Sequence, residues 1–404
     1  MIRQVIYRIL KRRHFWRYAS FDEVAELYVS RMLTTFALRF VMVFASVYLY
    51  KLEYGIVTIA MFWAYYYGLK AIFAWPSAKI AARFGPKHGL LVANILFVPA
   101  MLLLFSVDKF GLPVLLLWGV LQAFAGTLNN LCYLVDFSKV KHSEHAGKEI
   151  GYMSIIEKVA AGVSPLLGGL AASLIHPSAA ILLAALFFLL SVVPIMHTAE
   201  QTRLRQKLTF KGFPWRLTSK GFVAQGAVGF DFFMTTTAWS LFITLIIFAS
   251  DGQEIYAKLG ALTSITLAVA MVSSYIFGRL IDRKQGLLLL QVMAILNAAT
   301  HVFRPTVNTP IGVIANNAVN DIATTGYAMA FSRGMFDTAD LSGFRIMYLF
   351  MMEIMADLGA CLAALLLGAL FMVFQDGMAM NVYFIVGGLM TLFIMTPRFA
   401  MYKK

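Results

Sequence analysis

Long apolar segments alternate with short polar segments along the whole chain. A bilayer-spanning α-helix needs about 20 mainly apolar residues, and each apolar segment is close to that length or longer. This pattern predicts an all-α integral membrane protein of about 12 transmembrane helices. The predicted spans lie near residues 30–50, 55–78, 89–107, 112–136, 149–174, 179–197, 222–248, 258–278, 287–303, 311–330, 344–374 and 380–397.

The composition agrees with lipid as the solvent for most of the 404 residues. Apolar residues make up 60% of the chain and charged residues only 13%, with a mean hydropathy of +0.76. A soluble domain with this balance has too few polar groups to cover its surface. The short connections leave no room for a catalytic domain, and neither a nucleotide-binding loop nor a nucleophile–base pair is apparent. We therefore expect no enzymatic activity.

The two cysteines do not indicate a cofactor. Cys132 and Cys361 both fall inside predicted helices, without a disulfide framework or metal-ligand spacing. We expect neither a cofactor nor a metal.

The net charge of +14 is distributed by side of the membrane. With a cytoplasmic N-terminus, the termini and even-numbered connections carry about 26 Lys and Arg, the odd-numbered connections about 4, and helices the remaining 4 of the 34. This is the positive-inside pattern, so we expect both termini in the cytoplasm and the chain in the plasma (cell inner) membrane. A nucleic-acid binder would cluster this charge on one folded module.

The N-terminal segment, residues 1–29, is basic and amphipathic. Ile2, Val5, Ile6 and Ile9 recur at helical spacing between basic residues, which is typical of a helix that lies on anionic lipids at the cytoplasmic face. An equally good interpretation is a simple orientation signal.

The chain divides into two similar halves. The basic segment 199–221 separates a six-helix region at 30–198 from another at 222–398, and residues 399–404 form a short tail. Tyr133 and Phe137 near the end of the fourth span recur as Tyr327 and Phe331 near the end of the tenth, 194 residues later. Duplication explains this repetition together with the even helix count.

Two loop motifs suggest a family. Residues 278–286 read GRLIDRKQG, and residues 78–87 read AKIAARFGPK. The first resembles the cytoplasmic-loop signature of the major facilitator superfamily, Gly-x-x-x-Asp-Arg-x-Gly-basic-basic, at Gly278, Asp282 and Arg283. The second is a reduced copy, with Ala82 in place of the aspartate.

The resemblance implies two six-helix bundles around a cavity lined by helices 1, 4, 7 and 10. It also implies a cytoplasmic gate that includes Arg83, Gly85, Gly278, Asp282 and Arg283. The fifth span, with Pro165, Gly168 and Gly169, is similar to a Gly/Pro-rich signature of facilitator antiporters. Gly119 stands where proton antiporters of the family often carry an arginine, so the resemblance does not extend to their coupling.

Eight ionisable residues lie well inside the predicted helices. A charge at the bilayer centre costs roughly 3 kcal/mol, so these side chains must face one another or a wet cavity. Spans 3, 6, 9 and 12 contain none of them, which predicts four supporting helices that face lipid. His301, near the end of the ninth span, is expected at the membrane boundary. The eight are Arg39, Lys70, Glu157, Lys158, Asp231, Asp321, Glu353 and Asp357.

Polar residues near the midplane predict a substrate site between the halves. Arg39 is a candidate anion contact, and Asp231 and Asp321 are candidate cation or proton sites. The alternative is structural, with Arg39 held by Asp231 or Asp321 in a buried ion pair. The predicted substrate-binding residues are Arg39, Gln122, Asp231, Asn316, Asn317, Asn320 and Asp321.

Spans 5 and 11 carry a second set of charges: Glu157, Lys158, Glu353 and Asp357. Glu353 and Asp357 share one helix face, where two carboxylates do not ionise together without a cation. This predicts a site that couples transport to H⁺ or Na⁺. An ion pair between Lys158 and one of the two carboxylates, acting as a conformational latch, is an equally good interpretation.

The leading hypothesis is a monomeric secondary active transporter that moves a small solute by alternating access. One alternative is a transporter of lipid-like, amphipathic substrates, because the helices are rich in Phe and Met. Another is a degenerate family member that acts as a sensor or assembly partner without transport.

Overall fold

The computed structural model describes residues 21–140, 146–197, 208–248 and 254–399. Several predicted features lie outside these residues: the surface helix within residues 1–20, the first part of the linker up to residue 207, and the tail from residue 400.

Six long helices form the first half of the bundle in the described part of the chain. The first, α2, begins at Phe21 and is longer than predicted, because its helical pattern continues beyond the apolar span. The helices are α2 (Phe21–Lys51), α3 (Ile56–Phe84), α4 (Pro86–Phe105), α6 (Leu112–Val140), α7 (Ala146–Leu174) and α8 (Pro177–Ile195), with the single turn α5 (Val107–Phe110) before α6.

The second half repeats this arrangement, but two of its spans are interrupted. The seventh span combines α-helical and π-helical segments, and the eighth is divided at Thr266. The elements are α9 (Trp215–Phe233), η1 (Met234–Ala238), α10 (Trp239–Phe242), η2 (Ile243–Ile247), α11 (Glu254–Ile265), α12 (Leu267–Asp282), α13 (Gly286–Phe303), η3 (Arg304–Thr306), α14 (Pro310–Ser342), α15 (Arg345–Val373), α16 (Asp376–Thr391) and η4 (Leu392–Met395).

Proline and capping residues set the starts of several helices. Pro86, Pro177 and Pro310 occupy the first turn of α4, α8 and α14, where a missing N–H costs nothing. The Thr309 hydroxyl accepts a hydrogen bond from the backbone N–H of Gly312 at 3.1 Å, which caps α14. Gly343 ends this helix with a positive φ of 69°, a conformation that glycine adopts without strain.

Eleven helical segments among the described residues are long and apolar enough to cross a membrane. The twelfth long helix, α14, has 33 residues but is too polar to meet the same hydropathy criterion. The polar residues responsible are Asn316, Asn317, Asn320 and Asp321. The predicted all-α fold of about 12 membrane helices is confirmed.

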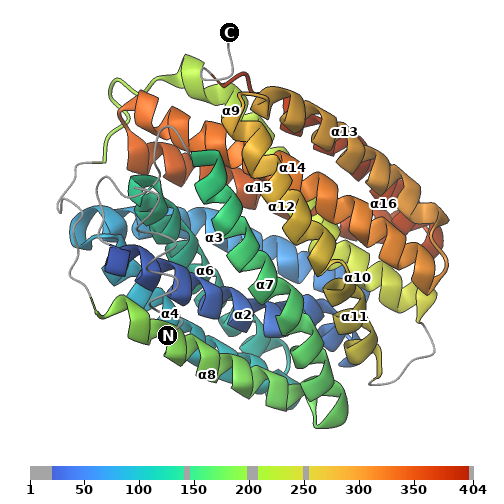
Figure 1. Cartoon of the computed structure of the whole chain (residues 1–404). Helices are drawn as coiled ribbons and strands as arrows, with labels where there is room; N and C mark the ends of the chain where they lie inside the picture. Colours follow the sequence, from blue (N-terminus) through green and yellow to red (C-terminus); the bar gives the residue numbers. More distant parts are fainter. Residues whose placement is uncertain (1–20, 141–145, 198–207, 249–253, 400–404) are drawn as a thin grey trace.

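The two halves meet along two pairs of membrane spans, the second of which involves both α11 and α12. Helix α3 of the first half packs against α15 of the second, and α7 packs against both α11 and α12. Figure 1 shows the halves as two inclined groups of helices, blue to green and yellow to red. We call one end of the bundle the basic end, where α3, α12 and α14 finish and where Arg83, Arg283 and Lys284 lie; the other is the opposite end.

Glycine allows the closest approach between halves near the opposite end. A Cβ atom at Gly169 of α7 would collide with the carbonyl of Tyr256, and one at Gly260 of α11 would collide with the carbonyl of Pro165. Small residues at such crossings let helix backbones come into direct contact. The Gly/Pro-rich pattern predicted for the fifth span therefore lies at the interface between the halves.

Glycine also lets α9 and α15 pack backbone to backbone inside the second half, and this contact leads to a stability prediction. A Cβ at Gly229 would collide with the carbonyl oxygen of Ala356. We expect Gly229→Ala to lower stability by about 1–3 kcal/mol, because rigid backbones must separate. Thermal unfolding of the purified protein in detergent measures this. The control is Gly377→Ala, where an added Cβ meets nothing within 4 Å; equal melting temperatures for the two variants would contradict the packing argument.

Candidate functional site

A cavity of about 430 Å³ lies between the two halves. The first half contributes α2 and α7 to its wall, and the second half contributes the α9–η2 span, the α11–α12 span and α14. This volume is in the range of small-molecule sites. The resemblance implied a cavity lined by the first, fourth, seventh and tenth spans. The first (α2), seventh (α9–η2) and tenth (α14) do line it. The fourth (α6) does not, and the fifth (α7) and eighth (α11–α12) line it instead.

The cavity brings together most of the charged and polar residues predicted for it. Five of the predicted substrate residues and two of the predicted coupling residues line its wall. They are Arg39, Asp231, Asn317, Asn320 and Asp321, with Glu157 and Lys158.

Two predicted substrate residues lie elsewhere. Gln122 is fully buried in α6, where its amide nitrogen contacts the sulfur of Met42 at 3.9 Å. Asn316 is buried on the far side of α14, donating to the carbonyl of Thr300 at 3.3 Å and accepting from Arg304 at 3.4 Å. The sequence places both at the right depth, but depth does not determine which way a side chain points. Both predictions are corrected: neither residue contacts the cavity.

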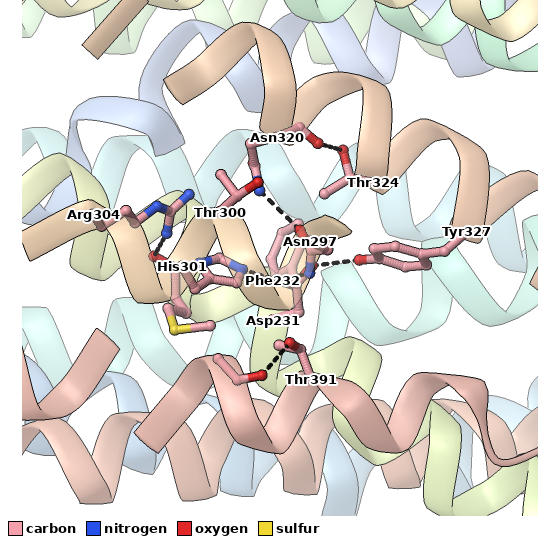
Figure 2. Close-up of polar contacts among 12 residues, drawn as sticks. Asp231, Phe232, Asn297, Thr300, His301, Arg304, Asn320, Thr324, Tyr327 and Thr391 are labelled. Atoms are coloured by element: carbon pink, nitrogen blue, oxygen red, sulfur yellow. Dashed lines mark hydrogen bonds and ion pairs between the residues drawn. The ribbon is translucent and has the colours of Figure 1, made fainter. Parts of the chain in front are cut away.

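Asp231 is the centre of a buried hydrogen-bond network in the second half. Figure 2 shows Asn297, His301 and Tyr327 around it. The Asn297 amide donates at 2.8 Å, the His301 Nε2 lies at 2.5 Å, and the Tyr327 hydroxyl donates as well. Asn320 extends the network by donating to the Asn297 carbonyl at 2.9 Å. Three donors around one carboxylate stabilise its charge away from water.

Helix α13 corrects the expectation that the ninth span is a plain supporting helix. His301 is fully buried rather than interfacial. Arg304, directly after the helix, is also fully buried, with its guanidinium over the rings of Trp239 at 4.6 Å and Phe384 at 5.4 Å. The sequence offered no signal for Arg304, because it lies beyond the apolar span.

The first half contains a matching network around a cation. Arg31 of α2 pairs with Glu157 of α7 at 2.7 Å and stands over the ring of Tyr133 at 4.1 Å. It also reaches Asn129 at 3.4 Å, and Asn129 donates to Asn94 of α4 at 2.9 Å. Tyr133 and Tyr327, the two members of the sequence repeat, thus occupy corresponding networks of opposite charge.

A third cluster joins the halves, and it corrects the predicted latch. Lys70 of α3 lies 2.5 Å from Asp357 and 3.7 Å from Glu353, both on α15. Asn130 of α6 donates to Glu353 at 2.6 Å. Lys158, expected to pair with one of these carboxylates, instead faces the cavity. The two carboxylates are nearly inaccessible, at 3% side-chain exposure each.

The structural alternative for Arg39, an ion pair with Asp231 or Asp321, is wrong. Arg39 makes no ion pair with any described residue; its guanidinium lies 5.8 Å from the ring of Phe232. Asp321 instead accepts a hydrogen bond from the Thr266 hydroxyl. Asn317 accepts from the Trp239 indole at 2.8 Å, which fixes its amide at the cavity wall.

The sequence analysis missed the hydroxyl groups that the seventh span presents to the cavity. Thr235, Thr236 and Ser240 line it, in and beside the π-helical segment η1. The Thr235 hydroxyl is buried without a hydrogen-bond partner among the described residues. The sequence signal that could have found these hydroxyl groups is the run of three threonines at 235–237. In the structure this run lies in a π-helical segment, and π-helical turns are frequent at functional sites.

The predicted gate residues lie at the basic end. Gly278 of α12 faces Gly151 of α7, where an added Cβ would come within 3.7 Å of the Gly278 Cα. Gly85 has a positive φ of 92° between α3 and α4, which requires glycine. Arg83 and Arg283 are exposed near these turns. In the described part of the chain, no group of three or more His, Cys, Asp or Glu side chains is arranged to hold a metal ion.

A family model and several solved structures match this chain. A model described as Major Facilitator Superfamily matches residues 27–364. The crystal structure of the human organic anion transporter MFSD10 (TETRAN) superposes with a TM-score of 0.71 at 10% identity, covering 93% of this chain and 99% of that chain. The E. coli fucose:proton symporter FucP gives a TM-score of 0.65 at 13% identity, covering 92% and 97%. No curated protein sequence matches.

The Asp231 network generates a second stability prediction. Tyr327→Phe removes one of three donors to a buried carboxylate, so we expect a loss of about 1.5–3 kcal/mol. Thermal unfolding in detergent measures it, with Tyr65→Phe as the control, because the Tyr65 hydroxyl makes only an exposed 3.4 Å hydrogen bond. If both variants unfold at the wild-type temperature, the Tyr327 hydroxyl does not stabilise Asp231.

Proposed function

Because this chain belongs to the major facilitator superfamily, and is therefore a multi-pass membrane transporter, we propose that it is a secondary active transporter of a small solute. The membership confirms the expectation of a transporter rather than an enzyme. The proposed mechanism is alternating access, in which the two halves rock around a central site.

The observation that carries the proposal is the cavity between the halves, with contacts between the halves on both sides of it. Towards the basic end, Phe137 of α6 packs on Phe336 of α14, with ring centroids 5.3 Å apart. Towards the opposite end, Phe44 of α2 packs on Tyr256 of α11 at 5.9 Å. Such aromatic pairs can separate one at a time, which would open the cavity to one side and then the other.

We assign the basic end to the cytoplasm, because Lys and Arg concentrate on the cytoplasmic side of membrane proteins. The protein would then lie in the plasma (inner) membrane with both termini inside the cell. Gly278, Asp282 and Arg283, with Arg83 and Gly85, would form the cytoplasmic gate. The close approach of Gly278 to Gly151 supports this role, because these helices must separate for the gate to open.

We assign coupling to the cluster of Lys70, Glu353 and Asp357, which crosses from one half to the other. One lysine faces two buried carboxylates, and one oxygen of each carboxylate is buried without a hydrogen-bond partner among the described residues. A proton or a monovalent cation would balance the second negative charge. Binding it would therefore favour the conformation in which the halves meet here. Glu157 serves its own half, through Arg31.

Alternating access predicts that the cavity is reachable from both membrane faces. Thr324 lines the cavity. A single cysteine at this position, in a Cys132→Ser, Cys361→Ser background, should react with a membrane-impermeant maleimide added to either face of sealed vesicles. The measurement is the labelling rate from each side.

Two control cysteines in the same background define the faces: Lys109→Cys, exposed at the opposite end, and Gln285→Cys, exposed at the basic end. Each should react from one face only. Labelling of Thr324→Cys from a single face under all conditions would overturn alternating access and favour a protein that does not transport.

The coupling cluster predicts a pH-dependent stability loss. Lys70→Gln leaves two buried carboxylates without a cation, which should cost about 3–5 kcal/mol near neutral pH. Acidification protonates the carboxylates and removes the need for a cation. The loss relative to wild type should therefore shrink as pH falls from about 8 to about 5, as measured by thermal unfolding. The control is exposed Lys109→Gln. A loss that does not change with pH would argue against a charge imbalance at this site.

A further inference from the structure

The charges that line the cavity are not all balanced by the protein. Glu157 is paired with Arg31 at 2.7 Å. Asp231 is surrounded by three donors of the second half. Three charged groups of the cavity wall remain after these are accounted for: Arg39, Lys158 and Asp321.

The two cations among them come from the first half. Arg39 lies on α2 and Lys158 on α7, and both are half-buried. Across the described residues, neither makes an ion pair or a hydrogen bond; Arg39 only faces the ring of Phe232. Like-charged groups on one wall create a local positive potential, which is strengthened by the surrounding apolar medium.

The acid comes from the second half. Asp321 lies on α14 and accepts from the Thr266 hydroxyl. No lysine, arginine or histidine of the described chain lies within ion-pair distance of it. The cavity therefore has a positive wall and a negative wall, with space between them.

A half-buried charge without an ion-pair partner costs free energy in a membrane protein, and a ligand that places the opposite charge beside it would remove that cost. A carboxylate would pair with the positive wall, because its two oxygens offer about four lone-pair sites to guanidinium or ammonium donors. An ammonium group would pair with Asp321. The unpartnered Thr235 hydroxyl supplies a further hydrogen-bonding group on the same wall of the cavity.

We propose that the cavity binds a small zwitterion of the amino-acid type, with its carboxylate against Arg39 and Lys158 and its ammonium group against Asp321. This assignment rests on the proposed function, because it takes the cavity to be the substrate site. It selects against ligands that carry only one of the two charges, since each leaves one wall unpaired.

The test uses the purified full-length protein in lipid nanodiscs and isothermal titration calorimetry. The twenty common amino acids are titrated first. Each one that binds is then compared with its analogue that lacks the amine and its analogue that lacks the carboxylate, for example leucine with 4-methylpentanoate and 3-methylbutylamine. We expect at least one amino acid to bind about tenfold or more tightly than both of its analogues.

Variants separate the two walls. Asp321→Asn should abolish the preference for the amino acid over its amine-free analogue, while the affinity for that analogue stays unchanged or improves. Lys158→Gln and Arg39→Gln should each weaken both ligands by about tenfold or more. The controls are Asp376→Asn and Lys109→Gln, both exposed at the opposite end, which should bind as wild type does. Thermal unfolding checks that each variant is folded.

The outcomes are distinct from those of the proposed function. Equal or tighter binding of the amine-free analogue, or a preference that survives Asp321→Asn, would overturn the zwitterion and indicate a plain organic anion. Binding of no amino acid would overturn it as well. In each case the labelling of Thr324→Cys from both faces still decides, independently, whether the protein works by alternating access.

Discussion

Hydrocarbon cannot solvate a charge, and the rest of this structure follows from that constraint. Every helix exposes apolar side chains to lipid, so the ionisable groups must collect where helices face one another. They form one network inside each half, around Arg31 and around Asp231, and a third between the halves at Lys70. Two cations and one acid have no ion-pair partner in the described chain, and these three line the cavity. In the mechanism proposed here, the cost of burying charge is offset in two ways: by partners within the protein for the three networks, and by the ligand for the three groups of the cavity wall.

The two internal networks also show what a duplicated architecture preserves. Tyr133 and Tyr327 hold corresponding positions, one beneath an arginine and the other donating to an aspartate. Asparagines of the third and ninth spans, Asn94 and Asn297, complete both networks. Both networks contain a tyrosine and an asparagine, but the charged group that the tyrosine contacts is an arginine in one half and an aspartate in the other. A cavity between such halves has unlike walls: the first half lines it with its first and fifth spans, and the second half with its seventh, eighth and tenth.

Hydropathy and charge were sufficient to predict the helices, because bilayer thickness fixes helix length and the charges mark the connections. The family was predicted from the loop motif at residues 278–286. Hydropathy and charge also predicted that Arg39, Asp231 and Asp321 lie near the cavity, since a charge in a spanning helix has few other places to be. The partners could not be predicted. Helical periodicity shows which residues share a face of a helix, but it does not show which helix packs against that face. The sequence therefore could not show that Lys70, rather than Lys158, contacts Glu353 and Asp357. The prediction that Gln122 binds substrate was wrong for the same reason, because its side chain packs against Met42.

The π-helical segments of the seventh span have a geometric consequence for the cavity wall. Cavity-lining residues recur there at every fourth position, from Val228 to Phe232, Thr236 and Ser240, with a parallel row that starts at Asp231. In a regular α-helix, four residues overshoot one turn by about 40°, so such a row would spiral away from the ligand. The wider turn of η1, in the middle of both rows, counters that drift. The span therefore keeps one strip of its surface, which includes Asp231, Thr235, Thr236 and Ser240, turned towards the cavity over several turns. A helix of uniform pitch would turn part of that strip away from the cavity.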